Sequence, residues 1–215
     1  MAGFGRGADM SGSPTKMRDK ASRLAASDLA GAQEIAFAIK EPWFRCQAIA
    51  AVARHAETRD VQRFADAAFA AASACADDYK RSAVAAWPIR ALAERGFTDQ
   101  AMEALRRARL VAKTATPAAS SAEALFGLLQ AGWDLGSAPR REIVEDLVAL
   151  HARDTFWRIE RAVVDGLCML GAVERELAES IAQRITDAKC RAKALARIQA
   201  PFPVRPRGYF RALDP

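Results

Sequence analysis

The sequence predicts an all-α fold, arranged as a stack of about five antiparallel helix pairs. Alanine supplies 50 of the 215 residues, and it favours helices far more than strands. Apolar residues recur at helical spacing in segment after segment, and only one to five residues separate these segments. No alternating β-branched run and no Asn-Gly turn indicates a strand.

The first five expected helices cover residues 29–40, 42–57, 60–75, 78–96 and 98–113, and a further short helix is expected within 16–27. Residues that favour helix starts stand before or at these segments: Asp28, Pro42, Asp60, Asp77 or Asp78, and Thr98. Gly96 is a suitable residue to end the fourth helix. Pro88 lies inside that helix and is expected to kink or split it, because proline lacks the backbone N–H.

The next five expected helices cover residues 117–132, 139–153, 154–171, 172–185 and 187–199. Pro117, Pro139 and Asp154 mark the starts of the first three. Large aromatic residues fall on apolar helical faces and are expected in the core: Trp87, Trp133, Phe37, Phe64, Phe69, Phe97 and Phe126. The acidic side chains of Glu142, Glu145 and Asp146 are interpreted as a solvated helix face.

A related short sequence motif stands at the start of every second expected helix. It reads Glu41-Pro-Trp-Phe-Arg45, Asp78-Tyr-Lys-Arg81, Asp154-Thr-Phe-Trp-Arg158 and Asp187-Ala-Lys-Cys-Arg191, and with Ser120 as the third anchor the spacings are 36, 39, 38 and 33 residues. A two-helix unit at such a period is typical of a right-handed α-solenoid. Over residues 28–199 the units resemble the tetratricopeptide-like and HEAT-like helical repeats. The resemblance implies a scaffold that binds a protein or peptide partner.

The four arginines at these helix starts are the candidate binding residues. In a stack of equivalent units, Arg45, Arg81, Arg158 and Arg191 would form a ladder that can bind an acidic peptide or phosphates. The alternative is structural: each guanidinium pairs with an acidic residue of a neighbouring unit, or lies over Trp43, Tyr79 or Trp157.

A second hypothesis is a HEAT-like nucleic-acid-binding protein, including a DNA base-lesion enzyme. The net charge is +6, and it is concentrated in the first 23 and last 16 residues, as expected for ends that attract phosphates. Trp133 and Asp134 resemble the aromatic–acid pair of HEAT-like alkylpurine DNA glycosylases. The alternative for Asp134 is a turn or cap residue.

The sequence motifs favour a non-catalytic protein without a cofactor or a metal. The chain has no Cys-x-x-Cys, no His-Glu-x-x-His and no phosphate-binding glycine loop. Cys46, Cys75, Cys168 and Cys190 lie in apolar stretches and are expected to be reduced and buried. A third hypothesis, an enzyme whose helical active site carries no motif, stays open.

Composition and the ends of the chain complete the expected organisation. Residues 1–16 are expected to be a tail, 17–199 the helical-repeat domain, and 200–215 a Pro/Arg-rich segment. Phe202, Tyr209 and Phe210 are expected either to pack on the last unit or to dock on a partner. The sequence has no apolar run long enough for a membrane span, and residues 1–16 lack the apolar core of a secretory signal, so a cytoplasmic location is expected. The excess of arginine and alanine favours a bacterial source.

Overall fold

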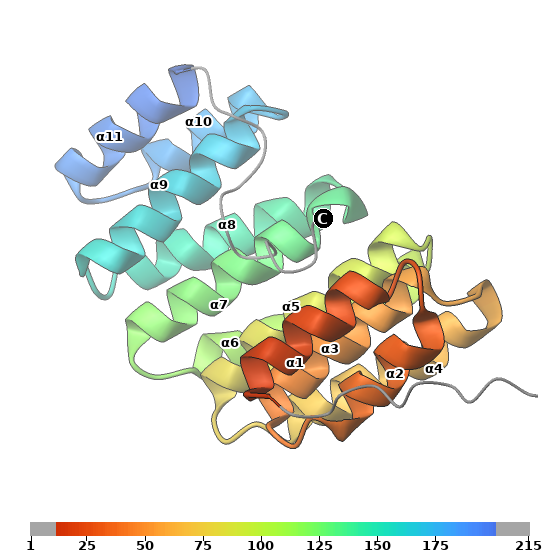
Figure 1. Ribbon diagram of the computed structural model, residues 1–215. Coiled ribbons are helices and arrows are strands. Elements are labelled where there is room, and N and C mark those ends of the chain that lie inside the picture. The colour runs from red at the N-terminus through yellow and green to blue at the C-terminus, as the bar shows by residue number, and fades with distance from the viewer. Residues whose placement is uncertain (1–11, 201–215) are drawn as a thin grey trace, which may run out of the picture.

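The computed structural model describes residues 12–200, and this part of the chain is all-helical (Figure 1). The expected all-α class is therefore confirmed. The segments 1–11 and 201–215, which include Phe202, Tyr209 and Phe210, lie outside the described residues. The elements are α1 (Pro14–Leu24), α2 (Leu29–Ala38), α3 (Pro42–His55), α4 (Thr58–Ser73), α5 (Asp78–Glu94), α6 (Thr98–Thr114), α7 (Ala118–Ala131), the 3-10 helix η1 (Trp133–Leu135), α8 (Ser137–His151), α9 (Trp157–Gly171), α10 (Arg175–Gln183) and α11 (Ala188–Gln199).

Some helix starts follow the predicted capping residues, whereas α4 begins two residues before Asp60 and α9 begins three residues after Asp154. The carboxylates of Asp28, Asp77 and Asp187 each accept a hydrogen bond from a backbone N–H of the first turn of α2, α5 and α11, at 2.9, 2.7 and 2.6 Å. Gly96 ends α5 with a φ of 79°. There the Phe97 N–H donates to the Leu92 carbonyl, as in a Schellman motif. The short helix expected within 16–27 exists as α1.

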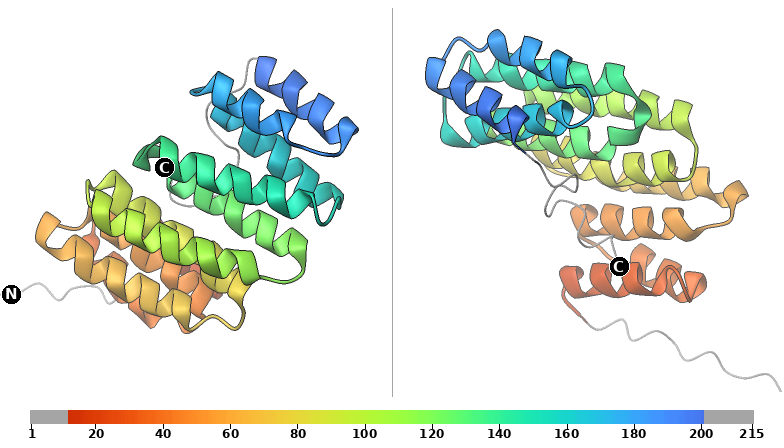
Figure 2. Two further views of the ribbon diagram at one scale, coloured as in Figure 1. Left: turned by 180° about the vertical axis from the view of Figure 1, so that it is seen from behind. Right: turned by 90° about the horizontal axis from the view of Figure 1, so that it is seen from above.

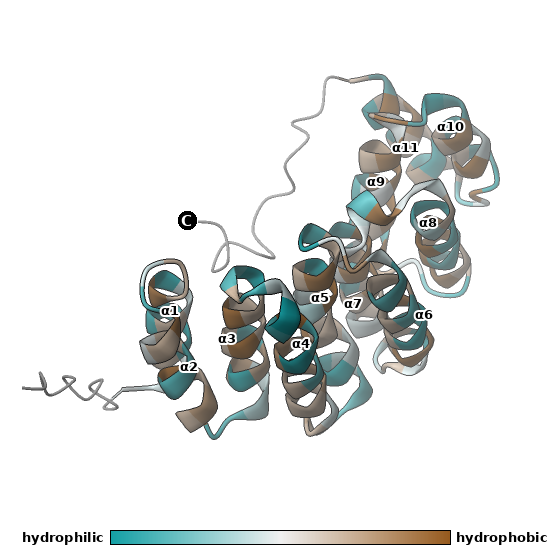
Figure 3. Cartoon of the chain, turned by 90° about the vertical axis from the view of Figure 1, so that its right-hand side faces the viewer, coloured by the Kyte–Doolittle hydropathy of each residue, from teal (hydrophilic) through white to brown (hydrophobic). Residues whose placement is uncertain are grey.

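The helices are arranged in two rows. The inner row contains α1, α3, α5, α7, α9 and α11, and each of these contacts the next member of the row. The outer row contains α2, α4, α6, α8 and α10, and each packs on the inner helices that precede and follow it. Figure 2 shows this order from behind and from above, and Figure 3 shows that the stack curves with the inner row inside.

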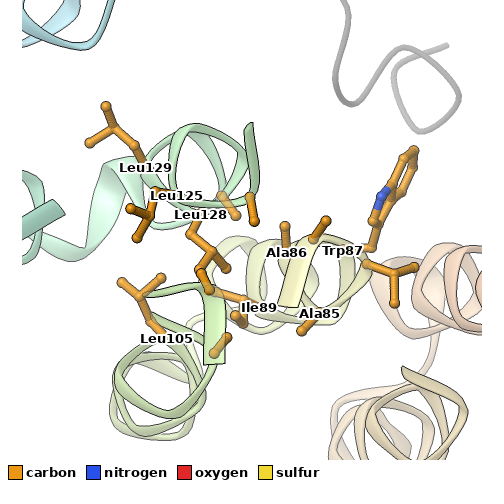
Figure 4. Packing of buried hydrophobic residues seen from close by; sticks show 14 of the residues in the cluster. Ala85, Ala86, Trp87, Ile89, Leu105, Leu125, Leu128 and Leu129 are labelled. Carbon is orange, nitrogen blue, oxygen red and sulfur yellow. The ribbon is translucent and has the colours of Figure 1, made fainter. Parts of the chain in front are cut away.

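The core lies between the two rows and consists largely of alanine with larger aliphatic residues. Figure 4 shows one layer of it, where Ile89 of α5, Leu105 of α6 and Leu128 of α7 meet. Trp87 and Phe64 are buried, and Phe37, Phe69, Phe97, Phe126 and Trp133 pack against the core, as predicted. Alanine lets helix axes approach closely, while the larger residues fill the space between layers.

Pro88 does not split α5, contrary to one of the two expected outcomes. The helix continues from Asp78 to Glu94 with Pro88 inside it. Proline cannot donate to the carbonyl four residues earlier, which is that of Val84. The thiol of Cys46 on α3 donates to this carbonyl instead, at 3.5 Å. A neighbouring helix therefore supplies the hydrogen bond that the proline removes.

Replacing Cys46 by alanine is expected to lower the free energy of unfolding by about 1–2 kcal/mol, because the Val84 carbonyl then stays buried without a donor. Urea denaturation measures this loss. In a Pro88→Ala background the backbone N–H of residue 88 can donate to Val84, so Cys46→Ala should be markedly less destabilising there. An equal loss in both backgrounds would contradict the role given to Cys46.

The acidic face of α8 is not simply solvated, which corrects the interpretation from sequence. Asp146 has a side chain only 11% exposed, and it pairs with Arg109 and Lys113 of α6 at 2.5 and 2.9 Å. Glu142 also pairs with Arg109. Glu145 pairs with Arg184, just past α10, at 3.1 Å. These carboxylates link neighbouring outer helices, and the sequence of α8 alone could not reveal their partners.

Candidate binding surface

Three of the four predicted arginines contact the turn or helix that precedes them. Arg81 donates from Nε to the Cys75 carbonyl at 2.9 Å, and Arg191 donates to the Ile185 carbonyl at 2.7 Å. Each therefore reaches back six residues to the end of the preceding helix. The Arg45 guanidinium lies over the ring of Phe37 on α2, 5.6 Å from its centroid. These three contacts hold consecutive helices together.

Arg158 is different because its contact is with an exposed residue of its own helix start. Its guanidinium lies 5.3 Å from the centroid of the Trp157 ring, and that of Arg161 lies 5.7 Å from the same ring. The Trp157 ring also lies against Phe156, with a centroid distance of 5.8 Å. We refer to Phe156, Trp157, Arg158 and Arg161 as the α9 patch.

The α9 patch is unusual in its exposure. Trp157 is 55% exposed and Phe156 is 46% exposed, whereas the other aromatic side chains within residues 12–200 are buried or half-buried. The remaining large apolar side chains exposed in residues 12–200 are Leu110 and Val173, and such isolated residues are common on protein surfaces. Two adjacent exposed aromatic side chains framed by two arginines have the composition typical of binding hot spots.

Sequence reasoning did not single out Phe156, Trp157 and Arg161 as a site, although one signal was available. Adjacent residues on a helix point about 100° apart, so two consecutive large aromatics at a helix start are hard to bury together, although Trp43 and Phe44 at the start of α3 both pack against the core. The Asp154 carboxylate accepts from the Phe156 N–H at 3.0 Å, which fixes the chain just before α9. The patch is thus presented by an ordered helix start.

Contacts at both ends of the inner-row helices hold neighbouring helices of this row together. At the helix starts, the Trp43 ring lies 6.3 Å from that of Tyr79, whose hydroxyl donates to Glu123 on α7 at 3.0 Å. Burial and the nearby Glu123 raise the pKa of Tyr79 to about 12, so the hydroxyl stays a donor. At the helix ends, Glu94 accepts from Arg54 and Arg90 at 2.5 and 2.6 Å.

A cavity lies between α4 and α6, and α5 forms its floor. Its volume is about 530 Å³, and its lining includes Phe69, Val111 and several alanines. The charged groups at its rim are engaged with neighbours: Arg81 with Asp78 at 3.1 Å, Arg107 with Glu103 at 3.3 Å, and Asp66 with Gln62 at 2.8 Å. The cavity is therefore largely apolar, and the two arginines at its rim are paired with carboxylates.

Trp133 and Asp134 lie in η1, between α7 and α8. The Arg140 guanidinium covers the Trp133 ring at 4.8 Å and donates to the Trp133 carbonyl at 2.8 Å. Arg140 itself pairs with Glu174 at 2.8 Å. Because Arg140 occupies the face of the indole, this arrangement favours packing over base stacking for Trp133. Asp134 is exposed beside it.

The four cysteines are free and buried, as expected. Burial raises the pKa of the Cys46 thiol well above its ordinary value, and the same cause raises the pKa of Cys190 to about 11. Thiols in this state are weak nucleophiles. Within residues 12–200 no group of three or more His, Cys, Asp or Glu side chains is close enough to hold a metal ion, and no helix there has the length and apolar character to cross a membrane.

Comparison of the chain with protein-family models, curated protein sequences and solved structures finds no match.

Proposed function

We propose that the chain is a non-catalytic scaffold of the helical-repeat class, a right-handed α-solenoid that binds a protein partner. Two features support the architecture: the order in which the helices contact one another, and the spacing of 36 residues that separates Trp43 from Tyr79, Arg45 from Arg81 and Arg54 from Arg90. A regular stack presents an extended surface suited to a partner.

The observation that carries the proposed function is the exposed pair Phe156 and Trp157 with Arg158 and Arg161 around it. Tryptophan and arginine dominate the residues whose truncation most weakens protein–protein complexes. Of the four arginines predicted from sequence, the proposal therefore keeps Arg158 as a binding residue and gives Arg45, Arg81 and Arg191 structural contacts. The raised thiol pKa values and the engaged charges of the cavity also favour binding over catalysis.

Trp157→Ala is expected to abolish capture of the partner without unfolding the chain. Truncating a hot-spot tryptophan weakens a complex by about 2 kcal/mol or more, roughly thirtyfold in Kd. The tagged full chain and its variant are used as baits in native lysate, with and without nuclease, and captured proteins are quantified by mass spectrometry.

Leu110→Ala is the matched control, because Leu110 is 67% exposed but lies on the outer-row helix α6. The proposed function requires a protein that survives nuclease, is lost with Trp157→Ala and is kept with Leu110→Ala. Equal capture by all three baits would contradict it. Capture that disappears with nuclease would instead support the nucleic-acid hypothesis.

A further inference from the structure

The charge of the α9 patch is less balanced than that of the contact between Arg140 and Trp133. Arg140 lies over Trp133 and also pairs with Glu174. Arg158 and Arg161 lie over Trp157, and in the described part of the chain no carboxylate is within ion-pair distance of either. Both arginines are exposed. The patch therefore combines an apolar surface with two guanidinium groups that are free to donate hydrogen bonds to carboxylates of a partner.

The neighbouring helix adds to this positive charge. The Lys193 ammonium of α11 pairs with Glu160 of α9 at 2.8 Å, so the first turn of α9 lies beside the second turn of α11. Lys189 is exposed one turn earlier on α11. Glu160 is thus already paired, and Asp165, one turn after Arg161, pairs with Arg197 at 3.8 Å. The positive charge of Arg158, Arg161 and Lys189 therefore remains in excess along this edge.

We infer that the α9 patch binds an acidic segment of the protein partner, with a large apolar side chain on Trp157 and Phe156 and carboxylates on Arg158 and Arg161. Arginine binds carboxylates through paired, charge-assisted hydrogen bonds, and an indole offers a large apolar contact. This inference rests on the proposed function and names the chemistry of the partner.

The acidic residue before the patch favours a peptide over a nucleic acid. A nucleic-acid strand needs a continuous basic track for its phosphates. Asp154 precedes the patch and is exposed, so it would repel a phosphate backbone that passes over the helix start. Separate carboxylates of a peptide can instead pair with the arginines and avoid Asp154.

The first experiment selects peptides without assuming a sequence. A random dodecapeptide phage library is panned on the wild-type full chain, and the enriched peptides are tested on Trp157→Ala. We expect enriched peptides with several Asp or Glu residues and at least one large apolar residue, and we expect their binding to be lost with Trp157→Ala.

The second experiment exchanges the charges. Two peptides are compared: an enriched acidic peptide, and a counterpart that has Lys at the acidic positions. Each is titrated into the wild-type chain and into the double variant Arg158→Glu/Arg161→Glu. The acidic peptide is expected to bind the variant about tenfold less tightly for each reversed arginine, and the lysine peptide is expected to bind the variant better than the wild type. Arg158→Lys/Arg161→Lys keeps the charge but not the paired hydrogen bonds, so it should bind the acidic peptide more tightly than the glutamate variant and less tightly than the wild type.

The outcomes separate this inference from the proposed function. Peptides that need Trp157 but are neutral or basic would overturn the acidic partner and leave the proposed function standing. Enriched peptides that ignore Trp157→Ala, or no enrichment at all, would contradict both. A fluorescent single-stranded oligonucleotide that binds the wild type and is lost with Trp157→Ala would assign the patch to nucleic acid and overturn the inference.

Discussion

Leu128→Ala is expected to lower the free energy of unfolding by about 3 kcal/mol, because the substitution opens a cavity in the centre of the stack. Leu128 is completely buried, and Figure 4 places it on α7, facing Ile89 of α5 and Leu105 of α6. Packing at this layer joins two consecutive helix pairs. The loss is measured by urea denaturation followed by circular dichroism.

The same substitution at an exposed site provides the control for this prediction. Leu110→Ala should change the free energy of unfolding by less than about 0.5 kcal/mol, because the side chain is 67% exposed and loses little burial. A loss at Leu128 as small as that at Leu110 would mean that α7 does not pack on α5 and α6 as described. A change in the slope of the denaturation curve would indicate that the stack unfolds in parts.

The helices could be predicted well because their boundaries depend on local chemistry. Asp28, Asp77 and Asp187 cap helices through their own side chains, and Gly96 takes a left-handed conformation that ends α5. Such signals lie within a few residues of the boundary they determine. The continuation of α5 through Pro88 was not predictable in this way, because the hydrogen bond that supports the continuous helix comes from Cys46 on another helix.

The candidate site could be predicted only in part, because side-chain contacts across helices decide it. The positions of Arg45, Arg81, Arg158 and Arg191 are visible in the sequence, but the direction of each guanidinium is not. Arg81 and Arg191 reach backbone carbonyls, whereas Arg158 lies over an exposed indole. Trp87 and Trp157 likewise differ in exposure, because Trp87 lies inside α5 whereas Trp157 is the first residue of α9, although each of these helices is flanked by four others.

Arg109→Met is expected to destabilise the chain by about 2 kcal/mol, because it leaves the nearly buried Asp146 with Lys113 as its remaining partner. Methionine retains the apolar stem of the arginine, so the loss reports the ion pairs rather than packing. Glu142, which is 44% exposed, can return to water and should contribute less. The difference from wild type is measured by urea denaturation at low and high salt, and it should shrink at high salt because these pairs are partly exposed.

Two further variants test whether this link acts as a unit. Arg106→Met on the same helix removes an exposed contact with Glu103 at 3.8 Å and should change the free energy of unfolding by less than about 0.5 kcal/mol. Asp146→Leu in the Arg109→Met background removes the carboxylate that lost its partner, so part of the stability should return. If the double variant is instead less stable than Arg109→Met, the link between α6 and α8 depends on Asp146 and Lys113 more than on Arg109. Recovery would show that the ion pairs set the spacing of the outer helices while the alanine-rich core supplies most of the stability.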